Sequence, residues 1–188
     1  MPNYLRFRQK VTNKKKEIME KEIINKLTNS ALHVFDLEDY YPAGIRSQLD
    51  ISQFLVEGFL LKEKEFRHAL KEFDWAQFQN QNVGIYCATD AIVPAWATIL
   101  VTVFVAPFAK KVVLGNSTEI ENVLYTEILS TVDFSVYQDK AVILKGCSKK
   151  PVPQSAYLLA MQQLQKFAKS VMYGEACSAV PLFKKPKA

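Results

Sequence analysis

The sequence contains three cysteines whose positions suggest a metal site. Short apolar runs that are typical of β-strands precede all three: Cys87 ends one such strand, Cys147 follows another and Cys177 lies just beyond a third. In parallel α/β sheets, ligands bind at the rim formed by the carboxyl ends of the strands. Zinc is held by thiolates, with a carboxylate or water in the fourth position. The sequence therefore predicts a metal site, with zinc as the leading metal, formed by Cys87, Cys147 and Cys177.

Two carboxylates accompany these thiols. Asp90 follows Cys87 by three residues, and Glu175 precedes Cys177 by two. Either carboxylate could complete the coordination or transfer a proton beside a metal-bound water. If the site is catalytic, metal-assisted hydrolysis is the expected reaction class, with Asp90 and Glu175 as the catalytic residues.

Two other interpretations of the cysteines stay open. The sequence has no Cys-x-x-Cys pair, and no histidine lies near any of the three thiols. Because unmodified cysteine often packs as a small buried hydrophobe, a non-catalytic, homodimeric interaction protein with inert thiols is the first alternative. A thiol-dependent enzyme is the second, and it predicts one cysteine that is alkylated much faster than the others.

A polar turn offers a candidate small-ligand site. Ser148 and Lys149, followed by Lys150, lie between a predicted strand at 141–145 and a predicted helix that begins at Gln154. A hydroxyl, ammonium groups and the amides at a helix start can hold an anion. We predict that Ser148 and Lys149 bind a cofactor or another small ligand; the alternative is that they are solvated loop residues.

An internal repeat indicates which elements position these residues. Three landmarks recur at one constant sequence spacing, which we call the repeat offset: Asp74 as Asp133, Pro94 as Pro153 and Gly115 as Gly174. A repeat of this length is one supersecondary unit used twice, and we place its copies at about 62–117 and 121–176. The two aspartates are expected to cap and pack the helix-to-strand connections.

The expected fold class is α/β: a mostly parallel sheet with helices on both faces, built from a tandem α-β-α-β duplication. Helical spacing of apolar residues predicts helices at 62–73, 94–109, 119–129 and 154–169, and short apolar runs predict strands at 83–87, 111–114, 141–145 and 171–173. Strands joined by helices run parallel, with right-handed crossovers, which places the four strands in one sheet. Ahead of the repeat we expect an N-terminal helix at 20–29 and an antiparallel pair of edge strands at 32–36 and 46–50.

The net charge of +5 is a property of the chain ends. Removing the nine basic residues of the two ends from the total of 24 leaves 15 basic against 19 acidic residues, a net charge of about −4. We expect a disordered basic leader at 1–18, a single α/β domain at 19–183 and a basic tail at 184–188. Nucleic-acid binding is therefore not expected of the folded part. Three cysteines without a signal sequence indicate a cytoplasmic protein.

One uncharged segment resembles a transmembrane helix. From Ala91 to Ala109 no residue is charged, and the length is close to that of a transmembrane span. Pro94 and Pro107 bracket the run, however, and the repeat-related segment 153–168 carries four glutamines and a lysine. We therefore predict no membrane span but a helix that is buried on most sides, with Pro94 to Ala109 forming a homodimer interface.

Four motifs resemble those of one protein family. They are Asp36-Leu-Glu-Asp-Tyr-Tyr-Pro42, Asp90-Ala-Ile-Val-Pro-Ala-Trp-Ala97, Lys145-Gly-Cys-Ser-Lys-Lys-Pro-Val-Pro153 and Met172-Tyr-Gly-Glu-Ala-Cys-Ser178. In this order they resemble an uncharacterised, Bacteroidetes-type family, domain of unknown function 2480, over about residues 19–185. The resemblance implies no activity. It does place Asp90, Cys147, Glu175 and Cys177 within the motifs of the family.

Overall fold

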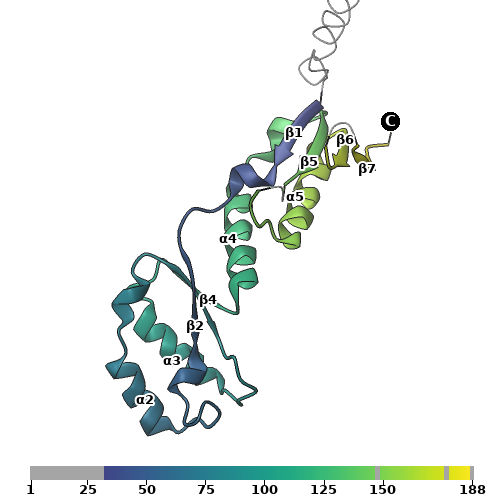
Figure 1. Cartoon of the computed structure of the whole chain (residues 1–188). Coiled ribbons are helices and arrows are strands. Elements are labelled where there is room, and N and C mark those ends of the chain that lie inside the picture. The colour runs from purple at the N-terminus through teal and green to yellow at the C-terminus, as the bar shows by residue number, and fades with distance from the viewer. Residues whose placement is uncertain (1–31, 147–148, 176–177, 187–188) are drawn as a thin grey trace, which may run out of the picture.

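Two β-sheets organise the computed structural model, which describes residues 32–146, 149–175 and 178–186 (Figure 1). The strands are β1 Leu32–Asp36, β2 Arg46–Asp50, β3 Asn82–Tyr86, β4 Lys111–Leu114, β5 Ala141–Lys145, β6 Ser170–Tyr173 and β7 Val180–Lys184. Their orders are β1-β5-β6-β7 and β2-β3-β4. Among these strands of the described residues, only the β6–β7 pair is antiparallel. The predicted α/β class and mostly parallel pairing are confirmed.

Helices connect these strands at the places that the sequence indicates. The described helices are α2 Glu63–Glu72, α3 Ala95–Val105, α4 Ser117–Thr131 and α5 Gln154–Phe167. Four one-turn 3-10 helices accompany them: η1 Leu37–Tyr40, η2 Ile51–Phe54, η3 Trp75–Phe78 and η4 Phe134–Tyr137. The predicted leader at 1–18 and the predicted helix at 20–29 lie outside the described residues. Among the described helices, none combines the length and apolar character that crossing a bilayer requires.

The expectation of one continuous sheet, with β1 and β2 as an antiparallel edge pair, was wrong. β1 pairs in parallel with β5, and β2 pairs in parallel with β3. The apolar side chains in and after each strand explain the difference. Phe35 and Leu37 are buried in one core together with α5, whereas Leu49 and Ile51 are buried in another together with α3. Each leading strand therefore joins the sheet over which its own apolar residues are buried.

The two sheets form the centres of two lobes (Figure 1). Lobe one comprises residues 46–114, with sheet β2-β3-β4 and helices α2 and α3. Lobe two comprises residues 32–40 and 132–186, with sheet β1-β5-β6-β7 and helix α5. Helix α4 lies between the lobes, and the molecule is elongated along the direction that joins them. Lobe one is thus inserted in the chain between β1 and the rest of lobe two.

The local geometry recurs at the repeat offset. Asp74 Oδ1 accepts a hydrogen bond from Ala76 N at 3.0 Å, and Asp133 Oδ1 accepts one from Ser135 N at 2.9 Å. The strand registers match as well, since Asn82 pairs with Lys111 as Ala141 pairs with Ser170. These short-range cap bonds turn the chain from each helix into the next strand, which is the role expected of the two aspartates.

Helix α4 joins the lobes because its two halves bury side chains against different partners. Ile120 and Leu124 pack with Val113 of β4, whereas Tyr125 and Leu129 belong to the core of lobe two. Burial of apolar area on both sides stabilises the helix between the lobes. The position of each lobe relative to the other therefore depends on α4.

Gly84 allows α4 to lie close against lobe one. A Cβ atom at this position would lie 2.5 Å from the backbone oxygen of Gly115 and 3.1 Å from Ile120 Cδ1. The neighbouring residues Val83 and Ile85 point to the opposite face, where they pack in the core that contains α3. Sheet β2-β3-β4 is therefore covered on both faces, as predicted.

Candidate functional site

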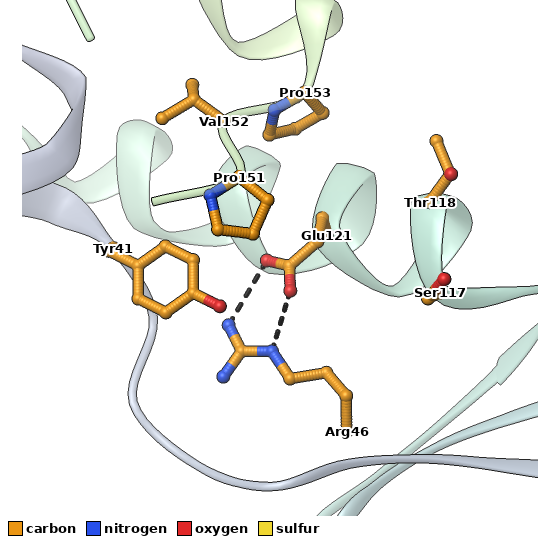
Figure 2. Close-up of a pocket in the computed structure, with 8 residues that line it drawn as sticks. All are labelled: Tyr41, Arg46, Ser117, Thr118, Glu121, Pro151, Val152 and Pro153. Carbon is orange, nitrogen blue, oxygen red and sulfur yellow. Dashed lines mark hydrogen bonds and ion pairs between the residues drawn. The ribbon is translucent and has the colours of Figure 1, made fainter. Parts of the chain in front are cut away.

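A pocket lies at the junction of the lobes (Figure 2). Its cavity volume is about 320 Å³, and we call it the junction pocket; it is lined by Tyr41, Arg46, Ser117, Thr118, Glu121, Pro151, Val152 and Pro153. These residues come from three segments that are far apart in sequence: the linker into β2, the first turns of α4, and the turn before α5. Small-molecule sites commonly have this size and lie between structural units.

Arg46 and Glu121 form a two-pronged ion pair in this pocket (Figure 2). Arg46 Nε donates to Glu121 Oε1 at 2.7 Å, and Nη2 donates to Oε2 at 3.1 Å. Nη1 donates to the carbonyl oxygen of Gly44 at 2.5 Å. The two side chains are only 15% and 11% exposed. Burial alone lowers the pKa of Arg46, but the hydrogen bond and the charge of Glu121 outweigh it, so the pKa is raised and the guanidinium stays charged.

The start of α4 presents polar groups to the same pocket. Asn116 Oδ1 accepts a hydrogen bond from Thr118 N at 2.7 Å, and Glu119 Oε2 accepts one from Asn116 N at 3.0 Å. This capping box satisfies backbone amides at the helix start. The side chains of Ser117 and Thr118 remain exposed, so their hydroxyl groups can contact a ligand. Glu121 follows within about one helical turn.

Tyr41 lies between this pair and a second cation. Arg46 Cζ lies 4.7 Å from the centre of the Tyr41 ring, and Lys150 Nζ lies 5.4 Å from it. Cations are attracted to an aromatic face at such distances. Lys150 Nζ also donates to the carbonyl oxygen of Glu38 at 3.1 Å. A second positive charge is thus held at the edge of the pocket.

Tyr125 fixes the orientation of α4 at this level. It follows Glu121 by four residues, and its hydroxyl donates to the carbonyl oxygen of Leu37 at 3.2 Å. Burial raises the pKa of Tyr125, and the charge of Glu121 raises it further. The phenol is therefore neutral at physiological pH and keeps its hydrogen bond to η1, which holds Glu121 in its place beside the pocket.

The turn predicted to bind an anion lies next to the junction pocket. Lys149 N donates to Glu38 Oε1 at 2.8 Å, so a carboxylate of the chain itself accepts a hydrogen bond from this amide. Ser148 lies outside the described residues. Ligand binding by Ser148 and Lys149 therefore stays a prediction. The residues that follow them, Pro151 to Pro153, form the apolar wall of the pocket.

Cys87 lies at the far end of lobe one from this pocket. Strands β2 and β3 pair from Arg46 beside Asn82 to Asp50 beside Tyr86, so Cys87 follows the end of the strands that is opposite to Arg46. Its Sγ is 3.5 Å from Thr89 Oγ1. The thiol is half-buried and packs against the core of lobe one.

Asp90 is also on this far rim, at the lip of a second cavity. This cavity has a volume of about 460 Å³ and is otherwise apolar; its other lining residues are Phe59, Leu60, Leu61, Ala91, Ile92 and Pro94. The Asp90 side chain is exposed and makes no hydrogen bond to another described residue. Asp90 and Cys87 thus lie together on lobe one, as their short sequence spacing requires.

Glu175 lies on the rim of the other sheet. Lys145 Nζ, at the end of β5, is 3.9 Å from Glu175 Oε1 and 3.0 Å from Asp36 Oδ2. The hydrogen bond with Asp36 is the main reason why the pKa of Lys145 is raised. Glu175 and Asp90 therefore belong to different sheets, and the structure does not bring these two predicted catalytic residues to one rim.

The predicted zinc site stays a prediction. Cys147 and Cys177 lie outside the described residues. They follow β5 and β6, whereas Cys87 follows β3 of the other sheet, so the expectation that all three thiols share the rim of one sheet was wrong. Within residues 32–146, 149–175 and 178–186, no three His, Cys, Asp or Glu side chains are arranged to hold a metal ion.

Comparison with known protein families matches residues 21–185 to a protein of unknown function, DUF2480. The chain belongs to the DUF2480 family. This match covers most of the chain and confirms the resemblance carried by the four sequence motifs. Neither a comparison with curated proteins nor one with solved structures found a match.

The sequence of this DUF2480 chain did not predict the Arg46–Glu121 ion pair of the junction pocket. Arg46 and Glu121 are separated by 75 residues, and neither lies in a motif with a chemical signature. The one local signal was the helix start at Asn116, because Glu121 lies within the first turns that such a cap positions. No sequence pattern indicates that the first turns of α4 lie beside Arg46, the first residue of β2.

Proposed function

We propose that this DUF2480 protein binds a small organic anion, such as a carboxylate or a phosphate ester, in the junction pocket. The observation that carries the proposal is the nearly buried Arg46–Glu121 pair on the wall of an open cavity. A buried ion pair is costly to desolvate, and an apolar pair of similar volume would often be as stable or more stable. Its position beside a cavity supports a role in recognition.

The pocket offers two kinds of contact to such a ligand. Donors come from the Ser117 and Thr118 hydroxyls and from the guanidinium edge of Arg46. Apolar walls come from Tyr41 and the segment 151–153. Binding sites for small molecules combine mostly apolar walls with a few polar groups that fix the orientation. The combination fits a small ligand with one anionic end and one apolar end.

The charges beside the pocket support an anion rather than a cation. Glu121 is already paired with Arg46, and the Glu38 carboxylate accepts a hydrogen bond from Lys149 N. The ammonium group of Lys150 adds positive charge on the side of the pocket where the Tyr41 ring lies. In a partly enclosed site this charge attracts anions more strongly than it would in bulk water.

Metal-assisted hydrolysis is the reaction class that the sequence suggests. As the sequence suggested it, this reaction requires Cys87, Cys147 and Cys177 to hold one metal beside Asp90 or Glu175, and the placement of β3 in a different sheet from β5 and β6 argues against that arrangement. Of these residues, the described ones, Cys87, Asp90 and Glu175, do not line the junction pocket. We therefore propose ligand binding without assigning a chemical step to it.

Occluding the pocket tests the proposal. The Thr118→Phe substitution places an aromatic ring at the mouth, while Thr126→Phe places the same ring on α4 about 12 Å further along the helix, outside the pocket. Binding of citrate, glycerol phosphate and inorganic phosphate to the full chain is measured by calorimetry. We expect at least one probe to bind the wild type and the Thr126→Phe control, with about tenfold or greater weakening in Thr118→Phe. Absence of binding by all three probes, or equal binding by both variants, overturns the proposal.

A further inference from the structure

The outer face of α3 is apolar and uncovered. Ala97, Val101 and Val105 are buried in the core of lobe one, whereas Trp96 is partly exposed and Ile99 and Val103 are 64% and 63% exposed. The helix from Ala95 to Val105 contains no charged residue. Large contiguous apolar patches on a protein surface usually mark an interaction site.

The corresponding face of lobe two shows that such exposure is not a requirement of the fold. At the repeat offset, Trp96 corresponds to Ser155 and Val103 corresponds to Gln162. Ser155 Oγ donates a hydrogen bond to Asn122 Oδ1 of the neighbouring helix at 2.6 Å. The helix in the same place in lobe two therefore carries polar residues at two positions where α3 carries Trp96 and Val103.

A groove runs beside this face, between α2 and α3. Its volume is about 380 Å³, and it is lined by Glu63, Arg67, Trp96, Ile99, Leu100 and Val103. The indole of Trp96 is held by the edge of the Phe66 ring, at 5.9 Å between centres, and by the Arg67 guanidinium, at 5.8 Å. The groove thus has an ordered aromatic side chain on its α3 wall, and the exposed side chains of Ile99 and Val103 continue this wall as a ridge along α3.

We propose that a second copy of this chain covers this face, with the α3 helices packed across a two-fold axis. The ridge and the groove share the same helix, so two copies can insert the ridge of each into the groove of the other. The uncharged α3 face can be buried in this way without leaving an unpaired charge. A partner with a charged surface would leave such charges unpaired.

The two charges that line the groove fit the same symmetry. Arg67 Nε and Glu63 Oε1 form an ion pair at 2.9 Å within one chain, and both side chains are largely exposed. A two-fold axis reverses their order, so Arg67 can face Glu63 of the partner subunit and Glu63 can face Arg67 of the partner subunit. Opposite charges at the rim of an interface favour the correct register and partner. This interaction surface is independent of the junction pocket, which none of these residues lines.

The test uses the mass of the full chain in solution, measured by sedimentation over a concentration series. We expect a dimer for the wild type, a monomer for the Ile99→Glu variant, and a dimer for the matched control Leu158→Glu, whose side chain is similarly exposed at the repeat-related position on α5. The far-ultraviolet circular dichroism of all three should agree. A wild type that is monomeric at every concentration, or an Ile99→Glu variant that remains dimeric, overturns the proposal.

Charge reversal provides a second readout that does not depend on the apolar ridge. Glu63→Arg and Arg67→Glu should each weaken self-association about tenfold, because like charges then face each other across the axis. An equimolar mixture of these two variants should restore the dimer, since each supplies the charge that the other lacks. If mixing restores nothing although both variants are folded, the two-fold arrangement is wrong.

Discussion

Arg46, the first residue of β2, binds Glu121 of α4 through two hydrogen bonds of 2.7 and 3.1 Å across a separation of 75 residues. The pair connects lobe one with the helix that carries lobe two. Both side chains are nearly buried, so neither charge can be solvated fully if the other is lost. The same pair therefore stabilises the contact between the lobes and lines the junction pocket.

Removal of one charge from this pair should destabilise the protein strongly. We expect Glu121→Gln to lower the free energy of unfolding by about 3 kcal/mol, because the Arg46 guanidinium then stays buried without its carboxylate. The control is Glu127→Gln on the same helix, whose partner Lys111 and whose own side chain are far more exposed. That change should cost about 0.5 kcal/mol or less. Equal losses in a denaturant titration would show that burial does not distinguish the two pairs.

A single methyl group at Gly84 should separate α4 from lobe one. Alanine in place of glycine within a strand usually stabilises a protein slightly, because it restricts the unfolded chain. Here the new Cβ would meet the backbone oxygen of Gly115 at 2.5 Å, and backbone cannot yield as a flexible side chain would. We expect Gly84→Ala to destabilise the protein by about 2 kcal/mol in thermal or chemical unfolding. A neutral or stabilising effect would contradict the close approach of α4.

The carboxylate of Asp50 should make stability depend on pH. Burial raises its pKa, but hydrogen bonds from the Ser52 hydroxyl and from the amides of Ser52 and Ala88 outweigh this and lower the pKa. A lowered pKa means that the contribution is present above the pKa of the unfolded state, about 3.9, and is lost as the pH falls through the folded pKa. We expect Asp50→Asn to cost about 1 kcal/mol at neutral pH, and less at acidic pH.

The control for this titration is Asp90→Asn, a nearby aspartate that makes no hydrogen bond to another described residue. Its effect on the free energy of unfolding should be small, because no hydrogen bond to a described residue is lost. An Asp50→Asn variant whose deficit persists unchanged below about pH 3, or grows there, would contradict the assignment of the lowered pKa to this carboxylate.

Cys87 should not share a metal with the other two cysteines. It follows β3 at the far rim of lobe one, whereas Cys147 and Cys177 follow strands of the other sheet. We therefore expect Cys87→Ser to bind as much metal per chain as the wild type does, in elemental analysis of protein purified without added metal. An equal loss of metal in Cys87→Ser, Cys147→Ser and Cys177→Ser would establish one shared site. A wild type without stoichiometric metal would remove the zinc hypothesis.

Sequence patterns predicted the elements that depend on nearby residues. The caps at Asp74 and Asp133 and the helices that begin after Pro94 and Pro153 rest on contacts within a few residues. Periodicity and cap chemistry are visible in the sequence for such contacts. Such local geometry can therefore be predicted from the sequence alone.

The pairing of strands was not accessible in the same way, because it is decided by distant residues. Gly84 has no side chain, so α4 can pack closely against sheet β2-β3-β4. The repeat-related residue in β5, Ile143, carries a large side chain at the same position of the other sheet. Only contacts across the fold show that Ile120 and Leu124 of α4 pack against lobe one, while Tyr125 and Leu129 pack in the core of lobe two. The Arg46–Glu121 pair escaped prediction for the same reason. The three cysteines would share one rim only if all the strands formed one sheet, and β3 lies in a different sheet from β5 and β6.

The most direct test of the central claim is the location of bound anion on the full chain. Amide chemical-shift changes are mapped by nuclear magnetic resonance while the tightest-binding of citrate, glycerol phosphate and inorganic phosphate is added. Binding in the junction pocket predicts that the largest changes occur at Tyr41, Arg46, Ser117, Thr118 and Glu121, and that they vanish in Thr118→Phe. Changes centred instead on Cys87 and Asp90, at the far rim of lobe one, would contradict the account.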